Sequence, residues 1–327
     1  MNGSQLRGRK ILITGGLGFI GSNLARRLVQ LGAEVTLLDS LLPRQGGSRT
    51  NVRGIEDQLR INISDQRNVL SLRHLVTDQD YIFNLAGQTS HMDSMSDPVE
   101  DLNLNCTAQL TLLEMCREHN PGCKIVFTST RQIYGRPDYL PVDEKHLLRP
   151  TDVNGINKVA GEAYHLLYNT VYGLRSTALR LTNTYGPRMR VKDARQTFLG
   201  IWIKLALQGE PFEVWGGEQL RDFSYVEDVV DALLIAATSP ETDGLAFNLS
   251  GDPVVSLAQV ADMLAKATDG RFEVREFPAD RKKIDIGDYY ADDRLFRATT
   301  GWSPRTPLET GLNLTLDFYR EHLAEYL

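Results

Sequence analysis

Two patterns of hydrophobic and polar residues alternate along the first half of the chain. Short runs rich in β-branched and apolar residues predict buried strands at Lys10–Thr14, Glu34–Leu38, Leu59–Ile61, Tyr81–Leu85, Lys124–Thr128 and Ser176–Arg180. Stretches with apolar residues three and four positions apart predict helices near Phe19–Leu31, Gln66–Val76, Val99–Glu118 and Gly155–Val171. Strands that alternate with helices are typical of a parallel sheet with crossover helices. The pattern therefore predicts an α/β fold built on a doubly wound parallel sheet.

The pattern changes from about Thr184, where Pro, Gly and Arg become scattered. Two further helices are predicted at Gln196–Gln208 and Leu257–Ala267. Two other elements, at Phe223–Ala237 and Ala246–Leu249, are predicted to return to the sheet. We therefore predict a larger domain over residues 1–183, joined by elements from about 223–250. A smaller C-terminal substrate-binding lobe is predicted to take most of residues 184–327.

The composition excludes several classes of protein. The 327 residues carry 36 Lys and Arg against 42 Asp and Glu, a net charge of −6, without a block of like charges. This balance argues against a nucleic-acid surface and favours a small-molecule ligand. The apolar runs are too short for a membrane span, and we expect a cytoplasmic protein without a signal peptide. Cys106, Cys116 and Cys123 lack metal-ligand spacing and are expected to be reduced thiols.

A glycine-rich turn follows the first predicted strand and leads into a helix. Gly15, Gly18 and Gly21 allow a tight turn, a close approach to a pyrophosphate and tight packing of helix on strand. Phe19 and Ile20 belong to the same turn, and the helix N-terminus favours an anion. The spacing is G-x-x-G-x-x-G rather than G-x-G-x-x-G. The turn predicts a Rossmann-like dinucleotide site.

A carboxylate follows at the place where such sites recognise ribose. Asp39 ends the second strand, 24 positions after Gly15, where it can accept hydrogen bonds from both adenosine ribose hydroxyls and repel a 2′-phosphate. NAD is therefore preferred over NADP, although Arg44 and Arg49 lie nearby in the sequence. Further cofactor contacts are predicted at the carboxyl ends of the next two strands, at Asn62, Ile63, Leu85, Ala86 and Gly87.

Seven segments give the chain its resemblance to a known family. They are ILITGGLGFIGSNL, NLAGQTSHMDSMSDP followed by Asn105, TSTRQIYG, LRLTNTYGPR, GGEQLRDFSYVEDVV, FNLSG and GWSPRTPLETGL. In this order, over nearly the whole length, they resemble the extended short-chain dehydrogenase/reductase family, specifically its NAD-dependent nucleotide-sugar epimerases and dehydratases. The resemblance implies a tightly held NAD and a nucleotide-diphosphate sugar as partner. It also implies that a sugar carbon is oxidised to a ketone and usually reduced again by the same hydride.

The chain departs from that family at one decisive position. The resemblance implies a Tyr-x-x-x-Lys pair on one helix face, in which the Tyr acts as base. Here Lys158 is present, but Asn154 stands at the tyrosine position, and an amide cannot replace a phenolate.

Three accounts of this departure stay open. Another group transfers the proton, with Tyr134, His91 and Asp93 as candidates. Alternatively, a desolvated Lys158 is the base and Asn154 orients the sugar. The third account is a protein that no longer oxidises a substrate.

The segment after the fifth predicted strand bears on the reaction type. Thr130 stands where the resemblance implies a hydroxyl that binds the reacting sugar oxygen. The 4,6-dehydratases have an acidic pair at the next two positions, whereas this chain has Arg131 and Gln132. That substitution disfavours a 4,6-dehydratase. The Gln-Thr-Ser run that begins at Gln88 resembles epimerases of the CDP-tyvelose 2-epimerase kind.

Substrate binding is predicted from the needs of a diphosphate, which are guanidinium groups and amides. The predicted substrate contacts are Gln88, His91, Thr130, Asn183, Arg190, Arg221 and Lys283. Lys283 is included because Asp285 stands where the family often has an arginine.

Two predicted helices suggest how copies of the chain associate. Val99–Glu118 and Gly155–Val171 carry extra apolar residues, namely Leu110, Leu113, Met115, Leu166, Leu167 and Tyr168. By resemblance these helices imply a homodimer.

The leading hypothesis is an NAD-dependent nucleotide-sugar epimerase in which Thr130 and Lys158 position the sugar. The alternatives are a nucleotide-sugar dehydratase or decarboxylase, and a pseudoenzyme that binds NAD and nucleotide sugar without turnover.

Overall fold

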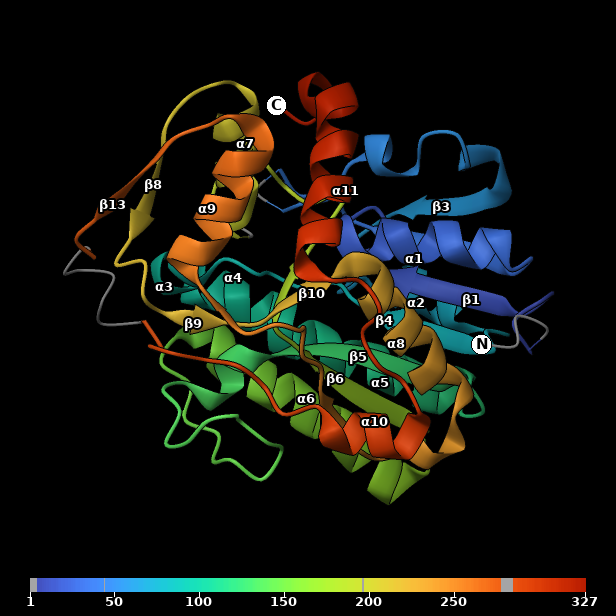
Figure 1. The fold of residues 1–327 in the computed structure, drawn as a ribbon. Helices are drawn as coiled ribbons and strands as arrows, with labels where there is room; N and C mark the ends of the chain where they lie inside the picture. The colour runs from blue at the N-terminus through green and yellow to red at the C-terminus, as the bar shows by residue number, and fades with distance from the viewer. Residues whose placement is uncertain (1–4, 44, 196, 278–284) are drawn as a thin grey trace.

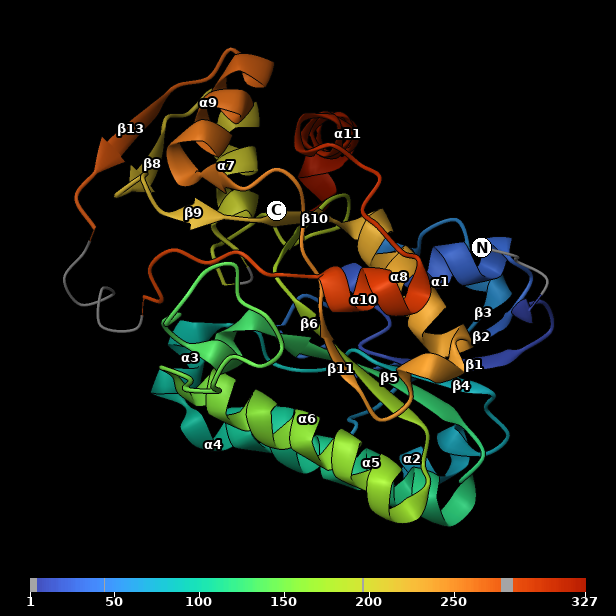
Figure 2. The ribbon, with the colours of Figure 1, turned by 60° about the horizontal axis from the view of Figure 1, so that its bottom comes forward.

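The computed structural model describes residues 5–43, 45–195, 197–277 and 285–327. Its main sheet has seven parallel strands in the order β11-β6-β5-β4-β1-β2-β3 (Figures 1 and 2). The strands are β1 Lys10–Thr14, β2 Glu34–Asp39, β3 Leu59–Ile63, β4 Tyr81–Asn84, β5 Lys124–Thr130, β6 Ser176–Leu181 and β11 Ala246–Asn248. The strand order reverses between β1 and β4, as in a doubly wound sheet. The predicted fold class is therefore confirmed.

Helices cover both faces of this sheet (Figures 1 and 2). One face packs against α1 (Phe19–Gln30), α8 (Val226–Thr238) and α10 (Arg294–Thr300), which share a core with β1. The other face packs against α2 (Val69–Val76), α5 (Ala108–His119) and α6 (Val153–Tyr172). Two residues assigned to a dimer face, Leu113 and Tyr168, belong to this second core, since burying their apolar surface stabilises the protomer itself.

Helix α6 begins and ends where local chemistry dictates. The Asp152 side chain accepts the Gly155 N–H at 2.7 Å and so caps the first turn. Gly173 ends the helix in the left-handed conformation, at φ +69°. The start of α6 is therefore fixed two residues before Asn154.

The single helix predicted over Val99–Glu118 is interrupted. The structure has α4 (Pro98–Leu102), a π-helical turn over Asn103–Thr107, and then α5. A π-helical turn inserts one extra residue and is found mostly at functional sites. Here the turn contains Asn105, whose backbone oxygen would lie 2.8 Å from a Cβ added at Gly161 on α6. The two helices therefore approach closely at this turn.

The second half of the chain builds small sheets and a separate core. Its further elements are β7 Asn183–Tyr185, β8 Phe212–Trp215, β9 Leu220–Arg221, β10 Phe223–Tyr225, β12 Val255–Ser256, β13 Phe272–Arg275, α7 Phe198–Leu207, α9 Leu257–Thr268 and α11 Leu308–His322. Helices α7, α9 and α11 share one apolar cluster. Of the elements expected to return to the main sheet, β11 pairs with β6 and α8 packs on the sheet, whereas β10 pairs with β7 outside it. The short helix α3 (His91–Ser96) follows β4.

The described residues contain no helix long and apolar enough to cross a membrane. Cys106, Cys116 and Cys123 are free thiols, and the last two are buried.

His165 on α6 gives the core a dependence on pH. Its ring is fully buried, stacks on Phe127 at 4.5 Å between centroids, and contacts Asn84 and Ser176 through its two nitrogens. Burial, together with a smaller effect of the charge of Lys158, lowers its pKa to about 3. The ring is therefore neutral in the folded protein well below the pH at which an unfolded His165 would take up a proton.

We predict that this histidine destabilises the fold as the pH falls from 6.5 towards 3. The unfolded chain binds a proton in this range and the folded chain does not, so the free energy of unfolding should fall by about 1.4 kcal/mol per pH unit from this residue. Denaturant unfolding of the wild type and of His165→Gln across this range measures the effect. Parallel pH dependences in the two proteins would contradict it.

Candidate active site

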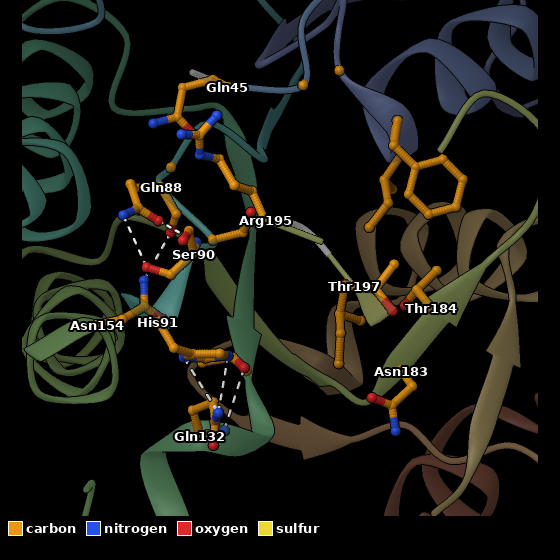
Figure 3. Close-up of a pocket in the computed structure, with 18 of the residues that line it drawn as sticks. Gln45, Gln88, Ser90, His91, Gln132, Asn154, Asn183, Thr184, Arg195 and Thr197 are labelled. Atoms are coloured by element: carbon orange, nitrogen blue, oxygen red, sulfur yellow. Dashed lines mark hydrogen bonds between the residues drawn. The ribbon is translucent and has the colours of Figure 1, made fainter. Parts of the chain in front are cut away.

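A cavity of about 980 Å³ lies at the carboxyl ends of the parallel strands, between the main sheet and the small sheets. It gathers most of the residues that the sequence singled out. The predicted residues that line it are Gly15, Gly18, Phe19, Ile20, Gly21, Asp39, Leu85, Ala86, Gly87, Gln88, His91, Thr130, Asn154, Lys158, Asn183 and Arg221. In the close-up, Gln88, His91 and Asn154 stand on one wall, while Asn183, Thr184 and Thr197 stand on the facing wall (Figure 3).

The glycine turn at one end leaves room only for backbone. Gly15 has φ +67°, and a Cβ added there would lie 3.0 Å from the backbone of Ala86. A Cβ at Gly21 would lie 2.3 Å from the Gly15 oxygen. The turn therefore packs directly on the end of β4, and the first amides of α1 open onto the cavity.

Asp39 stands beside that turn at the end of β2. Its carboxylate accepts the N–H of Leu17 at 3.0 Å and of Leu41 at 2.9 Å, while burial raises its pKa. Each carboxylate oxygen can still accept a second hydrogen bond. The Asp39 side chain is therefore placed as a rigid acceptor on the cavity wall.

The end of β3 is placed differently from the prediction. Asn62 and Ile63 do not line the cavity, and Asn62 instead accepts the Ser64 hydroxyl at 2.6 Å. Ser64, Asp65 and the buried Gln66 line the cavity at this place. The contact therefore comes one to three residues later, because β3 runs on through Ile63.

Lys158 lies buried beneath the middle of the cavity. Its Nζ donates to the Thr128 oxygen at 3.1 Å and lies 4.9 Å from the centre of the Phe127 ring. A Cβ added at Gly87 would lie 3.2 Å from this Nζ. The absence of a side chain at Gly87, just after β4, therefore leaves space next to the ammonium group. Burial lowers the pKa of Lys158 to about 8, against the opposing charges of Asp101 and Glu162. A substantial fraction is therefore neutral near physiological pH.

Asn154 is engaged in a buried amide network. Its Nδ2 donates to the Gln88 oxygen at 2.8 Å and to Asp101 Oδ2 at 3.3 Å. Asn105 donates to the same two acceptors, at 3.0 and 3.1 Å. Asn157 donates to the other carboxylate oxygen of Asp101 at 2.7 Å. The residue at the tyrosine position therefore ties α6 to the loop after β4 and to α4.

Thr130 and Tyr134 begin and end a single turn of 3-10 helix over Arg131–Tyr134. Thr130 lines the cavity, and its hydroxyl also accepts the Gln132 N–H at 3.3 Å. Tyr134 is fully buried away from the cavity lining, donates to Asn248 at 2.7 Å and accepts from Arg180 at 2.6 Å. Burial raises its pKa well above the usual value. A catalytic role for Tyr134 is therefore wrong, because its hydroxyl is a packed part of the core.

His91 begins α3 and faces the cavity. Its Nδ1 lies 2.8 Å from Asp152 Oδ2, and its Nε2 lies 2.9 Å from Gln132 Nε2. Sequence reasoning missed Asp152, which lies 61 positions away and whose only local signal is that of a helix cap. Burial works against ionisation of Asp152, but His91, the Gly155 N–H and Arg131 outweigh it and lower its pKa.

Positive charge gathers at the other end of the cavity. Arg131 donates to Asn183 Oδ1 at 3.1 Å and lies over the ring of Tyr289. Burial, together with a smaller effect of the charge of Arg131, lowers the pKa of Arg221 to about 10. Within the described residues, the buried Nη1 of Arg131 has no hydrogen-bond partner. Arg131 entered the sequence analysis only at a position where dehydratases have an acid, and its place on the cavity wall makes it a candidate for binding an anion.

One other predicted substrate contact, Arg190, lies elsewhere. Arg190 does not line the cavity, because Asp193, three residues later, pairs with its guanidinium at 2.6 and 2.7 Å. Arg195 of the same segment lines the cavity and pairs with Asp93 at 3.1 Å. Lys283 lies outside the described residues, as does Arg44.

The comparisons with known proteins agree with this geometry. Residues 11–250 match the model of the NAD dependent epimerase/dehydratase family. The chain belongs to this family. It is 30% identical over 315 residues to the putative UDP-glucose 4-epimerase of Methanocaldococcus jannaschii. That alignment covers 95% of this chain and 99% of the epimerase. It is 31% identical over 329 residues to UDP-glucuronic acid decarboxylase 1 of Xenopus tropicalis, which covers 96% of this chain and 73% of that protein.

A solved structure is similar over nearly the whole chain. The UDP-glucose 4-epimerase of Thermotoga maritima, crystallised with UDP-glucose, has a TM-score of 0.88 and 29% identity. The alignment covers 96% of this chain and 99% of that one.

NAD is the cofactor of this family, and the residues of the cavity fit it. The glycine turn presents amides and no side chain where a diphosphate needs them. Asp39 offers a fixed acceptor for ribose hydroxyls, and Lys158 would hold the second ribose behind Gly87.

We predict that Gly21→Ala removes NAD binding, because the new methyl group would lie 2.3 Å from a backbone oxygen and 2.9 Å from Gly16 Cα. Relief requires the turn to move, at a cost of about 1–3 kcal/mol in stability. The NAD retained after purification, with a thermal unfolding curve, measures both effects. Gly122→Ala is the matched control, since its methyl group would meet nothing within 4 Å. Wild-type NAD content in Gly21→Ala would refute the assignment.

Proposed function

We propose that this protein is an NAD-dependent nucleotide-sugar epimerase, which oxidises a sugar carbon to a ketone and reduces the intermediate from its other face. One observation carries the proposal. A single cavity joins the glycine turn, the buried Lys158 with its lowered pKa, and the cationic end at Arg131 and Arg221. NAD supplies the hydride acceptor and donor when bound.

The cationic end supports a diphosphate as part of the substrate. Burial lowers the pKa of both guanidinium groups, and the charge of Arg131 also lowers that of Arg221, so an anion between the two would stabilise them. Arg131 has an unused donor, and Asn183 offers an amide on the same wall. Bidentate guanidinium contacts are the usual recognition of phosphate oxygens.

Aromatic side chains on the cavity wall support a nucleobase as part of the substrate. Trp215 and Phe277 line the cavity with their ring centroids 6.3 Å apart. Phe198 and Trp202 line it from α7. Flat apolar rings favour stacking of a flat base.

The part of the cavity around Thr130 and Lys158, here called the reacting end, favours an epimerase over a 4,6-dehydratase. Thr130 offers a hydroxyl to the sugar oxygen, and Lys158 lies on the same cavity wall. A dehydratase needs an acid to protonate the leaving hydroxyl. Arg131 and Gln132 occupy the two positions after Thr130, and neither is a proton donor of that kind.

One observation favours a second candidate, a nucleotide-sugar decarboxylase. The unused donor of Arg131 could also bind the carboxylate of a sugar acid. The similarity to a UDP-glucuronic acid decarboxylase supports that reading. A decarboxylase requires a uronate substrate and releases carbon dioxide, whereas an epimerase conserves mass.

We predict turnover in a proton NMR time course of the protein with NAD and a panel of UDP-, dTDP-, CDP-, ADP- and GDP-sugars, including uronates, in deuterated water. An epimerase yields a new anomeric signal without loss of carbon. Lys158→Ala should lower the rate by about 10²–10⁴-fold, while Lys266→Ala, on an exposed lysine of α9, should not. Product only from uronates, with release of carbon dioxide, would replace the epimerase by the decarboxylase. Silence across the panel would leave a binding protein.

We predict that Arg131→Gln weakens the binding of UDP by about 10–100-fold, the loss of one or two charge-assisted hydrogen bonds. Isothermal titration with UDP measures it. Arg294→Gln is the control, since that side chain is 85% exposed outside the cavity. An unchanged UDP affinity in Arg131→Gln would remove this residue from the diphosphate site.

The homodimer stays a prediction. Its support is a set of exposed apolar side chains on α4 and α6, namely Val99, Leu102, Ile156, Leu167, Val171 and Tyr172.

A further inference from the structure

The proton that leaves the sugar hydroxyl needs an acceptor, and Asn154 is not one. Of the four titratable side chains considered as proton acceptors, two are excluded by their contacts. Tyr134 is packed in the core, and Asp93 is paired with Arg195. Lys158 and His91 remain on the cavity wall. Lys158 is held against the Thr128 oxygen behind Gly87, on the side of the cavity assigned to the cofactor.

His91 is held as a base would be held. Asp152 Oδ1 caps α6, and its buried Oδ2 lies 2.8 Å from His91 Nδ1 but accepts no hydrogen bond within the described residues. A small rotation of the imidazole would let Nδ1 donate to this carboxylate, and the proton of the neutral ring would then stay on that nitrogen. The Nε2 atom is then the acceptor of the ring, and the Gln132 amide nitrogen lies beside the imidazole, 2.9 Å from Nε2 and 3.3 Å from Nδ1. A sugar hydroxyl placed at Nε2 in the cavity would donate to its lone pair.

We propose that His91, oriented by Asp152, is the general base and acid of this enzyme in place of the absent tyrosine. This inference rests on the proposed epimerase function. The sugar O–H bond breaks and its proton moves to His91 Nε2. NAD, when bound, would supply the acceptor for the hydride from the C–H bond of the same carbon, which would thereby be oxidised to a ketone. Asp152 neutralises the imidazolium, and the return step reverses every transfer on the other face of the ketone.

The pair forms at one place because α6 and α3 meet there. Asp152 stands two residues before Asn154, and His91 three residues after Gln88, whose oxygen accepts from Asn154. The network that fixes Asn154 therefore also fixes the distance between the carboxylate and the imidazole. His91 is the catalytic residue in this arrangement, and Asp152 is a positioning residue.

We predict that His91→Ala lowers kcat by about 10²–10⁴-fold, the usual contribution of a general base. The substrate is the nucleotide sugar that gives the strongest signal in the NMR panel. Bound NAD and UDP affinity should be unchanged, and added imidazole should restore turnover and the reduction of NAD seen at 340 nm. His74→Ala, on the exposed face of α2, is the matched control. Wild-type kcat in His91→Ala, or a loss that imidazole does not restore, would overturn the proposal.

Asp152→Asn tests the positioning role, because asparagine keeps the helix cap and removes the charge. The acid limb of kcat/KM should move to lower pH, since the imidazolium loses its anionic partner. The other charges near this pair are Arg131, which acts on Asp152, and the Asp93–Arg195 ion pair. Asp97→Asn, at the cap of α4, should leave the pH profile unmoved. An unmoved acid limb in Asp152→Asn would overturn the pairing.

The two proposals fail in different ways. If the wild type turns over a nucleotide sugar and His91→Ala does so equally well, the epimerase function stands and the histidine assignment falls. If the wild type is silent across the whole panel, the epimerase function falls and takes the assignment with it.

Discussion

The buried carboxylate of Asp101 fixes the cavity wall on which the whole site depends. Its side chain is 1% exposed and accepts hydrogen bonds from Asn105, Asn154 and Asn157. A carboxylate removed from water needs such donors, so none of the three amides can turn away without a large cost in free energy. Asn105 reaches the carboxylate from within the π-helical turn. The start of α6, the turn and the loop after β4 are thereby held as one unit.

This unit explains how one helix start serves several parts of the site. Asp152 faces His91, Asn154 faces Asp101 and the Gln88 oxygen, and Lys158 rises one turn later towards Gly87. The spacing of two and four residues places the three side chains around one end of the cavity. The amide nitrogen of Asn154 is already hydrogen-bonded to the Gln88 oxygen and to Asp101. The proposed oxidation therefore needs a proton acceptor from another element, and α3 presents the His91 imidazole there.

Local signals accounted for most of the fold and for the cofactor end. Alternation of apolar runs predicted the strands β1 to β6, and the glycine spacing predicted the turn, because both signals act within a few residues. The partners that complete the reacting end are set by packing instead. Asn154 and Asp101 lie 53 positions apart, and Arg131 and Asn183 lie 52 apart. For Arg190 the local signal was misleading. Its basic segment predicted a ligand contact, but the guanidinium forms an ion pair with the neighbouring Asp193.

The distribution of charge in the cavity follows from burial rather than from the number of ionisable groups. Removing Lys158 from water lowers its pKa to about 8. The positively charged nicotinamide ring of NAD, when bound nearby, would favour the neutral form of this lysine further. Arg131 and Arg221 cannot lose their charge in the same way, because a guanidinium stays protonated. A proton can therefore move at the end that holds Lys158 and His91, whereas a fixed anion is favoured at the end that holds the two arginines. The proposed substrate, an uncharged sugar that carries a diphosphate, matches both ends, with its diphosphate at the arginines and its sugar near Thr130.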